Sequence, residues 1–320
     1  MHSVDAQDAP LVDRLVDAYP FKPYRNYRLL SRRQQTAVFH AEINRLLASP
    51  DRIAIVAGGG NRATLSVGRA LAWDTEFFGV PMARLDYVLR DDKHHRVDHD
   101  AAVRAFLARC RDVGIRHVSA RVDVADVINV AVLEDHGFRL MDTLVTYISH
   151  PRRPAPRQLR AIGTIRPFVP ADIEQVVEIT REAYQGFRGR FQLDPHLPRE
   201  RTEALYTEWA RRCCDGHMAD RVTVADDGQG GLYGWSSVKL VEPVSSIGGV
   251  PLFGGSLGAV RRDRPGAYAA LIGATARDNH AAGALTEAQT QNHNFPMVRT
   301  LEAVGAQYAR AEYALHAWLG

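Results

Sequence analysis

The chain has 320 residues, of which 46% are hydrophobic and 24% charged, and its formal net charge is +3. This length and composition exclude a disordered or fibrous protein and favour two globular domains. Three cysteines, two of them adjacent, fit neither a disulfide framework nor a zinc motif. The N-terminus lacks a signal peptide and no later segment is apolar enough to span a membrane, so we expect a soluble, cytoplasmic protein.

The first half of the chain alternates between helical and strand patterns. The predicted elements, in order, are a helix over 31–48, a hairpin of strands over 52–57 and 63–67 with a glycine turn at 58–61, a strand over 82–89, a polar loop over 91–100, a helix over 101–113 and a strand over 117–122. The polar loop holds histidines and aspartates, but Lys93 and Arg96 would repel a cation. We therefore expect no metal site.

The chain repeats itself at a shift of 168 residues. Identical pairs in this register are Ala101 and Ala269, Ala102 and Ala270, Ala108 and Ala276, Arg109 and Arg277, Ala120 and Ala288, Leu133 and Leu301, Glu134 and Glu302, and Gly137 and Gly305. Because the matches cross a helix, a strand and a turn, they predict a duplicated module. Residues from about 101 to 137 should repeat the strand and helix order of residues from about 269 to 305.

A segment rich in proline and arginine separates the two modules. We predict a first domain over residues 1–150, a linker over 151–163 and a second domain over 164–320. The linker carries Arg152, Arg153 and Arg157 and has no acidic residue, so these arginines are candidate contacts for the phosphates of a polyanionic partner. A solvated linker explains the same composition, and the mild net charge permits a polyanionic partner without requiring one.

The second module begins with a short strand and an amphipathic helix over 164–179. A hairpin follows, with strands over 222–225 and 232–240, then a strand over 257–260, a basic turn, a helix from about 267, a strand over 285–292 and a helix over 294–304. Residues 254–258 fit the G-x-S-x-G pattern of hydrolases, but strand residues follow the serine where a nucleophile elbow requires a helix. We expect no serine nucleophile.

The basic turn is the candidate anion site. Arg261, Arg262 and Arg264 lie beside a helix start, where backbone N–H groups without partners favour a phosphate. Pro265 suits the first helical turn, whereas the carboxylate of Asp263 could cap the helix and compete with a bound phosphate.

Several of these motifs resemble the GNAT superfamily of N-acyltransferases. Residues 73–79, Trp-Asp-Thr-Glu-Phe-Phe-Gly, resemble a signature of its dTDP-fucosamine acetyltransferase-type members, which carry a degenerate first module. Residues 253–272 resemble the strand, loop and helix that bind coenzyme A pyrophosphate, although Pro265 and Tyr268 depart from the family's glycine-rich loop. The resemblance implies an α/β fold (an α+β mixed sheet) in two tandem GNAT-like domains. Its implied donor contacts are Gly258, Val260, Arg261, Arg262, Arg264, Gly266, Ala267 and Asn294.

The catalytic residues are less clear from the resemblance. Leu301 stands where the family has the tyrosine that protonates the leaving thiolate. Glu287 shares a strand face with Gln289 and Gln291, so it is our first candidate for the base that accepts the amine's proton, and His293 is the second. For Glu287 and His293 a surface or structural polar role remains the alternative.

The resemblance implies transfer of an acyl group from acetyl-CoA, another acyl-CoA or a carrier thioester to a primary amine of a small molecule, such as an amino sugar or a biosynthetic intermediate. It implies no metal and no membrane partner. The altered loop and the missing tyrosine leave two other hypotheses. The donor could be an aminoacyl-tRNA, with tRNA as a partner, or the chain could be a non-catalytic binding protein with a GNAT fold.

Overall fold

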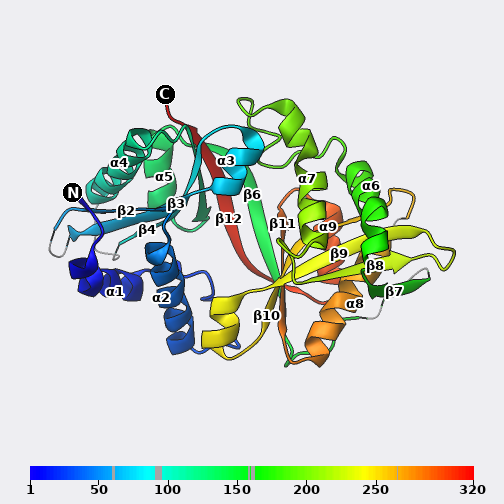
Figure 1. The fold of residues 1–320 in the computed structure, drawn as a ribbon. Helices are drawn as coiled ribbons and strands as arrows, with labels where there is room; N and C mark the ends of the chain where they lie inside the picture. Colours follow the sequence, from blue (N-terminus) through cyan, green and yellow to red (C-terminus); the bar gives the residue numbers. More distant parts are fainter. Residues whose placement is uncertain (60–61, 91–95, 158, 160–162, 265) are drawn as a thin grey trace. The chain divides into compact units, whose positions relative to one another are not determined.

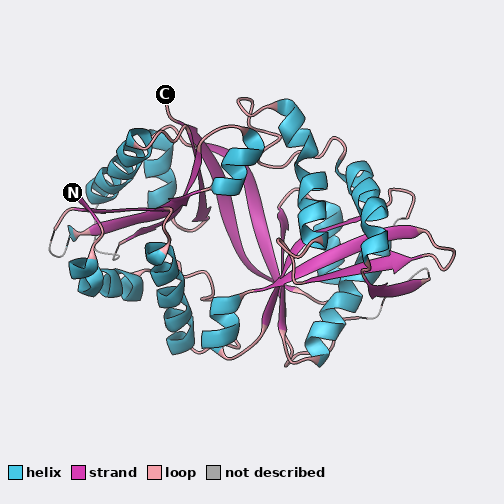
Figure 2. Cartoon of the chain, viewed as in Figure 1, coloured by secondary structure: helices cyan, strands magenta, loops and turns pink. Residues whose placement is uncertain are grey.

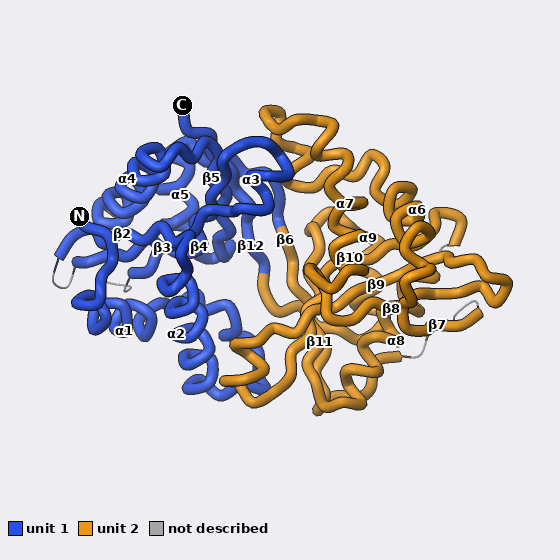
Figure 3. Tube along the Cα trace, viewed as in Figure 1, with its two compact units in different colours: residues 1–143, 311–320 blue, residues 144–310 orange. Residues whose placement is uncertain are grey.

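The computed structural model describes residues 1–320 except 60–61, 91–95, 158, 160–162 and 265. Parts of the predicted glycine turn, polar loop and linker, and Pro265, therefore lie outside the described residues. The chain forms two compact units, Met1–Thr143 with Ala311–Gly320 as unit 1 and Leu144–Arg310 as unit 2 (Figure 3).

Unit 1 is an α/β unit with strand order β1-β2-β3-β4-β5-β12 (Figures 1 and 2). Its described ladders are antiparallel except the parallel pair β4 and β5. The strands are β1 (His2–Ser3), β2 (Arg52–Ala57), β3 (Thr64–Ala70), β4 (Met82–Leu89), β5 (His117–Asp123) and β12 (Gln307–Trp318). The helices are η1 (Ala6–Asp8), α1 (Ala9–Ala18), α2 (Arg32–Ala48), α3 (Ala72–Phe78), α4 (Arg96–Asp112) and α5 (Val127–Asp135).

Unit 2 repeats this plan with strand order β7-β8-β9-β10-β11-β6. Again the described ladders are antiparallel except one, between β10 and β11. The strands are β6 (Arg139–Ser149), β7 (Thr164–Pro167), β8 (Arg221–Asp226), β9 (Leu232–Leu240), β10 (Leu252–Val260) and β11 (Leu285–Gln291). The helices are η3 (Pro170–Asp172), α6 (Ile173–Tyr184), α7 (Arg199–Cys214), η4 (Pro243–Ile247), α8 (Ala267–Ala281) and α9 (Phe295–Ala303).

The predicted duplication is confirmed by the element order. β5 and α5 recur as β11 and α9, each 168 residues later with the same bounds, and α4 and α8 precede them. The turns agree too, since Gly137 and Gly305 have φ of 84° and 90°, a left-handed conformation that favours glycine.

The last strand of each module pairs within the unit formed mainly by the other module. The linear domain boundaries predicted instead that each last strand would stay with its own module. β6 and β12 are equivalent under the same shift. Leu144–Ser149 of β6 pair with β11 in unit 2, whereas Glu312–Trp318 of β12 pair with β5 in unit 1. The predicted division at 151–163 concerns modules of the sequence and stays a prediction. The compact units follow packing instead, and the boundaries between them fall inside β6 and β12.

Unit 1 contains one helix that we did not predict and one segment for which the prediction was wrong. The polar start of the chain contains helix α1, which buries Val12, Leu15 and Val16. The second half of the predicted loop at 91–100 belongs to α4, where the ring Nε2 of buried His99 lies 2.9 Å from Oδ1 of Asn129. In both cases burial of a few side chains stabilises a helix that the polar composition obscured.

Unit 2 has helices on both faces of its sheet, and β10 divides its side chains between them. Leu257 and Ala259 pack in a core cluster with residues of α6 and α7, including Ile179 and Ala210. Val260 packs on the opposite side with Leu271 of α8. This alternation, which follows from the two-residue period of a strand, defines an α6/α7 face and an α8/α9 face.

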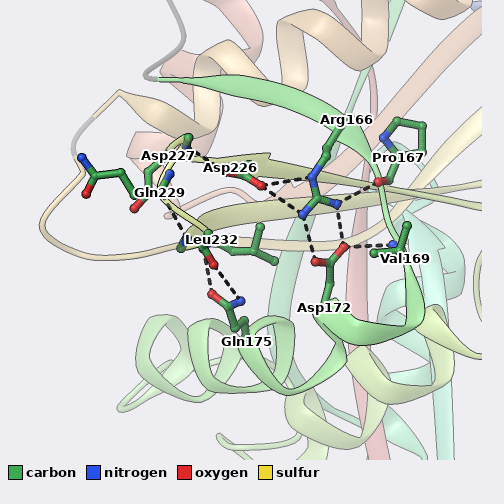
Figure 4. Close-up of polar contacts among 12 residues, drawn as sticks. Arg166, Pro167, Val169, Asp172, Gln175, Asp226, Asp227, Gln229 and Leu232 are labelled. Atoms are coloured by element: carbon green, nitrogen blue, oxygen red, sulfur yellow. Dashed lines mark hydrogen bonds and ion pairs between the residues drawn. The ribbon is translucent and has the colours of Figure 1, made fainter.

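A charged cluster anchors the edge strand of unit 2. The Arg166 guanidinium on β7 donates to both oxygens of Asp172, at 2.8 and 3.0 Å, and to Asp226 on β8 at 3.1 Å (Figure 4). Asp172 also accepts from the backbone N–H of Val169. The hydrogen bonds from Arg166 are the main cause that lowers the pKa of Asp172 below its usual value. The cluster therefore joins β7, β8 and the start of α6.

We expect Arg166→Met to lower the free energy of unfolding by about 1.5–3 kcal/mol near neutral pH, because it leaves Asp172 without its charged donor. The stability that Asp172 contributes is complete above the unfolded-state pKa and is lost as the pH falls through the lower folded-state value. The variant should therefore lose less stability than the wild type on acidification. Urea unfolding at several pH values measures both effects. Arg199→Met is the control, because that side chain is 90% exposed; equal acid sensitivity of wild type and Arg166→Met would contradict the assignment.

Candidate functional site

The parallel ladder between β10 and β11 ends early. Its described pairs are Leu252 with Leu285, Phe253 with Thr286 and Gly254 with Glu287. β10 continues to Val260, paired with β9 through a register shift between Gly255 and Gly258, and β11 continues to Gln291, paired with β6. Beyond Gly254 and Glu287 the described residues form no further pairs between these strands. The two parallel strands thus stop pairing at these residues. We call this point the opening of the ladder and place the candidate site beside it.

Polar side chains of β11 line the α6/α7 face at this opening. Glu287 lies on that face, because its neighbour Thr286 points to the other face, where it accepts a hydrogen bond from Asn279 of α8. Gln289 donates to the hydroxyl of Thr146 on β6 at 3.3 Å. Glu287 forms an ion pair with Arg310 of β12, at 3.8 Å between Oε2 and Nη1. The sequence indicated Glu287 but missed Arg310, because no pattern placed that part of β12 near β11.

Two arginines of the basic turn bind α6. Arg261 donates from Nε to the carbonyl of Leu232 at 3.0 Å and pairs with Glu182 at 3.4 Å. Arg262 donates its backbone N–H to Glu182 at 2.9 Å and its side chain to the carbonyl of Gln185 at 2.7 Å. These contacts fix the turn against α6 and partly neutralise its charge, so the phosphate-binding role of Arg261 and Arg262 stays a prediction.

The start of α8 remains suited to an anion. Gly266 is its N-cap, with φ of 82° and no side-chain cap, so the predicted capping by Asp263 is wrong. The Asp263 side chain is 70% exposed and lies 3.9 Å from Nε of Arg264. That Nε is shielded from solvent and has no hydrogen-bond partner among the described residues. A helix start without its own carboxylate, beside an unsatisfied guanidinium nitrogen, fits a phosphate group.

Tyr268 does not obstruct this helix start, contrary to our expectation. Its side chain packs with the small core cluster of Ala267 and Leu271. Burial raises the pKa of its hydroxyl to about 12. A Cβ atom built on Gly258 would lie 2.7 Å from the Tyr268 oxygen and 2.8 Å from the carbonyl oxygen of Trp235. Tyr268 therefore packs against β10 at Gly258, and a glycine is required there for that close packing.

Asn294 has a structural role that the resemblance did not indicate. Its side chain accepts from the backbone N–H of Met297 at 3.4 Å and donates to the hydroxyl of Thr290 at 3.0 Å. The equivalent Asp126 caps α5 in unit 1. His293, which precedes Asn294, is exposed, and Leu301 is buried. Donor binding by Asn294 stays a prediction, because capping alone explains this residue.

One tyrosine that we did not identify as a candidate from the sequence contacts β10. The hydroxyl of Tyr184, the last residue of α6, donates to the carbonyl of Gly258 at 3.1 Å. Its ring stacks on Tyr206 of α7 with centroids 4.0 Å apart. Burial raises the pKa of Tyr184 well above its usual value, so the group keeps its proton at neutral pH.

The described part of the predicted linker lies along α8. His280 contacts the carbonyl of Arg153 at 2.9 Å, and Arg277 donates to the carbonyl of Arg157 at 2.8 Å. The side chains of Arg152, Arg153 and Arg157 are exposed. The backbone is thus anchored while the three charges remain accessible. None of the described helices has the length and hydropathy needed to cross a membrane.

No protein-family model matches the chain. A curated relative, the spore coat polysaccharide biosynthesis protein SpsD of Bacillus subtilis, is 28% identical over 157 residues, which cover 48% of this chain. The match spans only 50% of the length of SpsD.

Solved structures resemble the whole chain. A GCN5-related N-acetyltransferase from Sphaerobacter thermophilus has a TM-score of 0.60 at 14% identity, covering 99% of this chain and 94% of its own. A tandem GNAT protein from the clavulanic acid biosynthesis pathway has a TM-score of 0.54 at 17% identity, covering 99% and 98% of the two chains. The predicted fold is therefore confirmed: the chain has a tandem GNAT fold.

Gly258→Ala should disturb the donor strand, because the new methyl group would overlap a backbone carbonyl and the Tyr268 hydroxyl. We expect a loss of about 1–3 kcal/mol in the free energy of unfolding. Gly254→Ala on the same strand is the matched control, since its Cβ would be 3.4 Å or more from its neighbours. Urea unfolding of both variants measures the difference; an equal cost for both would show that the close packing at Gly258 is not limiting.

Proposed function

We propose that unit 2 is an N-acyltransferase that moves an acyl group from an acyl-CoA or carrier thioester to a primary amine of a small molecule. The observation that carries this proposal is the end of the β10–β11 ladder at Gly254 and Glu287, in a unit where β10 leads into the anion-compatible start of α8. The tandem GNAT fold supports the reaction class. An amino sugar is a suitable acceptor, because SpsD is named for polysaccharide biosynthesis.

The donor would be held mainly at the start of α8. Arg264 and the backbone from Gly266 would bind its phosphates, and the opening beside Gly258 and Val260 would admit the acyl-bearing arm. When bound, the thioester supplies an activated acyl carbon. The amine nitrogen attacks this carbon, so that a C–N bond forms and the C–S bond breaks, and the electron pair of the C–S bond leaves on sulfur.

Two proton transfers must accompany this exchange. Glu287 would accept a proton from the ammonium, directly or through water, and His293 is the second candidate. The thiolate needs a proton, which buried Leu301 cannot supply. Tyr184 is a candidate donor, because its hydroxyl lies against the backbone of β10 and is protonated at neutral pH.

A second donor is favoured by one observation. The accessible charges of Arg152, Arg153 and Arg157 would suit the many phosphates of an aminoacyl-tRNA. With this donor the leaving group is a ribose hydroxyl, and the missing acid tyrosine matters less. A non-catalytic protein is the third hypothesis, which turnover of either donor would exclude.

The donor can be identified by comparing two arginines. For acetyl-CoA we expect Arg264→Ala to raise the dissociation constant about 10-fold or more, because a charge-assisted contact with phosphate is lost. Arg152→Ala should leave it unchanged. Calorimetry with acetyl-CoA and filter binding with aminoacyl-tRNA, each at several salt concentrations, provide the measurements. Binding of tRNA that weakens with salt and with Arg152→Ala, without acetyl-CoA binding, would instead support the tRNA donor.

Glu287→Gln should lower kcat about 100-fold or more if this carboxylate is the base, since the amide keeps the shape but accepts no proton. His293→Asn is the matched comparison and should retain most activity. Release of free thiol from acetyl-CoA in the presence of a panel of amines gives both rates. Full activity of Glu287→Gln at every pH tested would transfer the role to His293 or to water.

A further inference from the structure

The Glu287–Arg310 ion pair has an unusual position for a purely structural contact. The two side chains are 16% and 13% exposed, so both charges are largely removed from water. Their closest atoms are 3.8 Å apart, which is longer than a hydrogen bond, although each side chain also makes other contacts. Removing two charges from water is costly, so charged side chains are rarely this buried unless they are paired or serve a function.

The duplicated module supplies an internal comparison. At the shift of 168 residues, Glu287 and Arg310 correspond to Ser119 and Asp142 of the first module. A serine and an aspartate cannot form an ion pair. Unit 1 nevertheless forms the equivalent parallel ladder between β4 and β5 and the antiparallel ladder between β5 and β12. The fold therefore does not require opposite charges at these positions, and the pair distinguishes the unit with the candidate site.

The neighbours of the pair suit a small polar ligand. Gln289, two residues along β11 on the same face, adds a partly exposed amide, which donates to the hydroxyl of buried Thr146 on β6. A carboxylate and a guanidinium side by side are complementary to a ligand that carries an ammonium group and a carboxylate on adjacent atoms. Guanidinium binds carboxylate through two parallel N–H donors, which fixes both the position and the orientation of the ligand.

We propose that Arg310 determines acceptor specificity by binding a carboxylate next to the reacting amine, so that the acceptor is an amino acid or a similar amino carboxylate. In this arrangement the ammonium group lies at Glu287, which takes its proton, and the carboxylate lies at Arg310. The proposal rests on the N-acyltransferase function and narrows its acceptor from primary amines in general to zwitterionic ones. Amines that lack a carboxylate, such as glucosamine, would make the contact with Glu287 but not the contact with Arg310.

The test compares acceptors with and without the carboxylate. Wild type, Arg310→Gln and Arg310→Lys are supplied with acetyl-CoA and either the proteinogenic L-amino acids or the corresponding amino acid amides, and acylated products are quantified by mass spectrometry. We expect the wild type to prefer an amino acid, and Arg310→Gln to raise its KM about 10- to 100-fold, as for the loss of a charge-assisted contact. Arg310→Lys should restore part of the effect. The KM for the matching amide should stay within about 2-fold in all three proteins, since the amide has no carboxylate to pair with residue 310.

A binding measurement separates this inference from the proposed reaction. Saturation-transfer NMR with the same amino acids, without donor, reports binding even if no product forms. Binding that requires Arg310 without any acylation would refute the N-acyltransferase but support the specificity site. Equal use of acids, amides and glucosamine, or equal damage by Arg310→Gln to all acceptors, would overturn the inference while leaving the acyltransferase intact. Absence of both amino acid binding and amino acid turnover would overturn it as well.

Discussion

The early end of a parallel ladder is the constraint on which the candidate site depends. β10 and β11 are joined by α8, so they run in the same direction and their carboxyl ends lie at one edge of the sheet. After Gly254 and Glu287 they no longer pair, and the register shift in β10 accompanies this separation. Beyond this point backbone groups of the two strands no longer bond to each other, so they are available to other partners. The start of α8 and the polar face of β11 are positioned by that geometry.

Unit 1 shows what the same scaffold does without such a site. β4 and β5 pair in parallel over Met82–Leu85, and β4 continues beyond the ladder to Leu89. The next residue, Arg90, forms a buried ion pair with Asp126 at 2.6 Å, and its guanidinium lies 6.0 Å from the ring centroid of Phe21. At this place in unit 1 two protein side chains therefore satisfy each other. A structural role for the first module stays a prediction.

The contribution of β6 and β12 to the two sheets has a direct consequence for the site in unit 2. β11 pairs with a strand of the first module, which brings Thr146 beside Gln289. Arg310, the last residue of unit 2, reaches Glu287 just before β12 continues into unit 1. Residues from both modules therefore meet on one face of β11.

The sequence by itself determined the elements whose pattern is local. Apolar spacing gave β4 and the hairpin of β2 and β3 closely, and identities at one shift predicted that β5 and α5 recur as β11 and α9. Alternation along β11 was enough to place Glu287 on the polar face. These inferences succeeded because strand and helix periods are properties of consecutive residues. The resemblance of motifs, in turn, indicated a tandem GNAT fold before any packing was known.

Only the tertiary structure decided which groups meet. The sequence placed Asp263 as a helix cap and Tyr268 as an obstacle, but the cap is Gly266 and the tyrosine packs inside the unit. The sequence predicted that Arg261 and Arg262 bind a phosphate, but in the structure both residues contact Glu182 of α6. No sequence pattern indicated that Arg310 would contact Glu287. Side-chain partners and strand neighbours depend on contacts between residues far apart in the chain, and these are set by burial and chain path, which local periodicity does not encode.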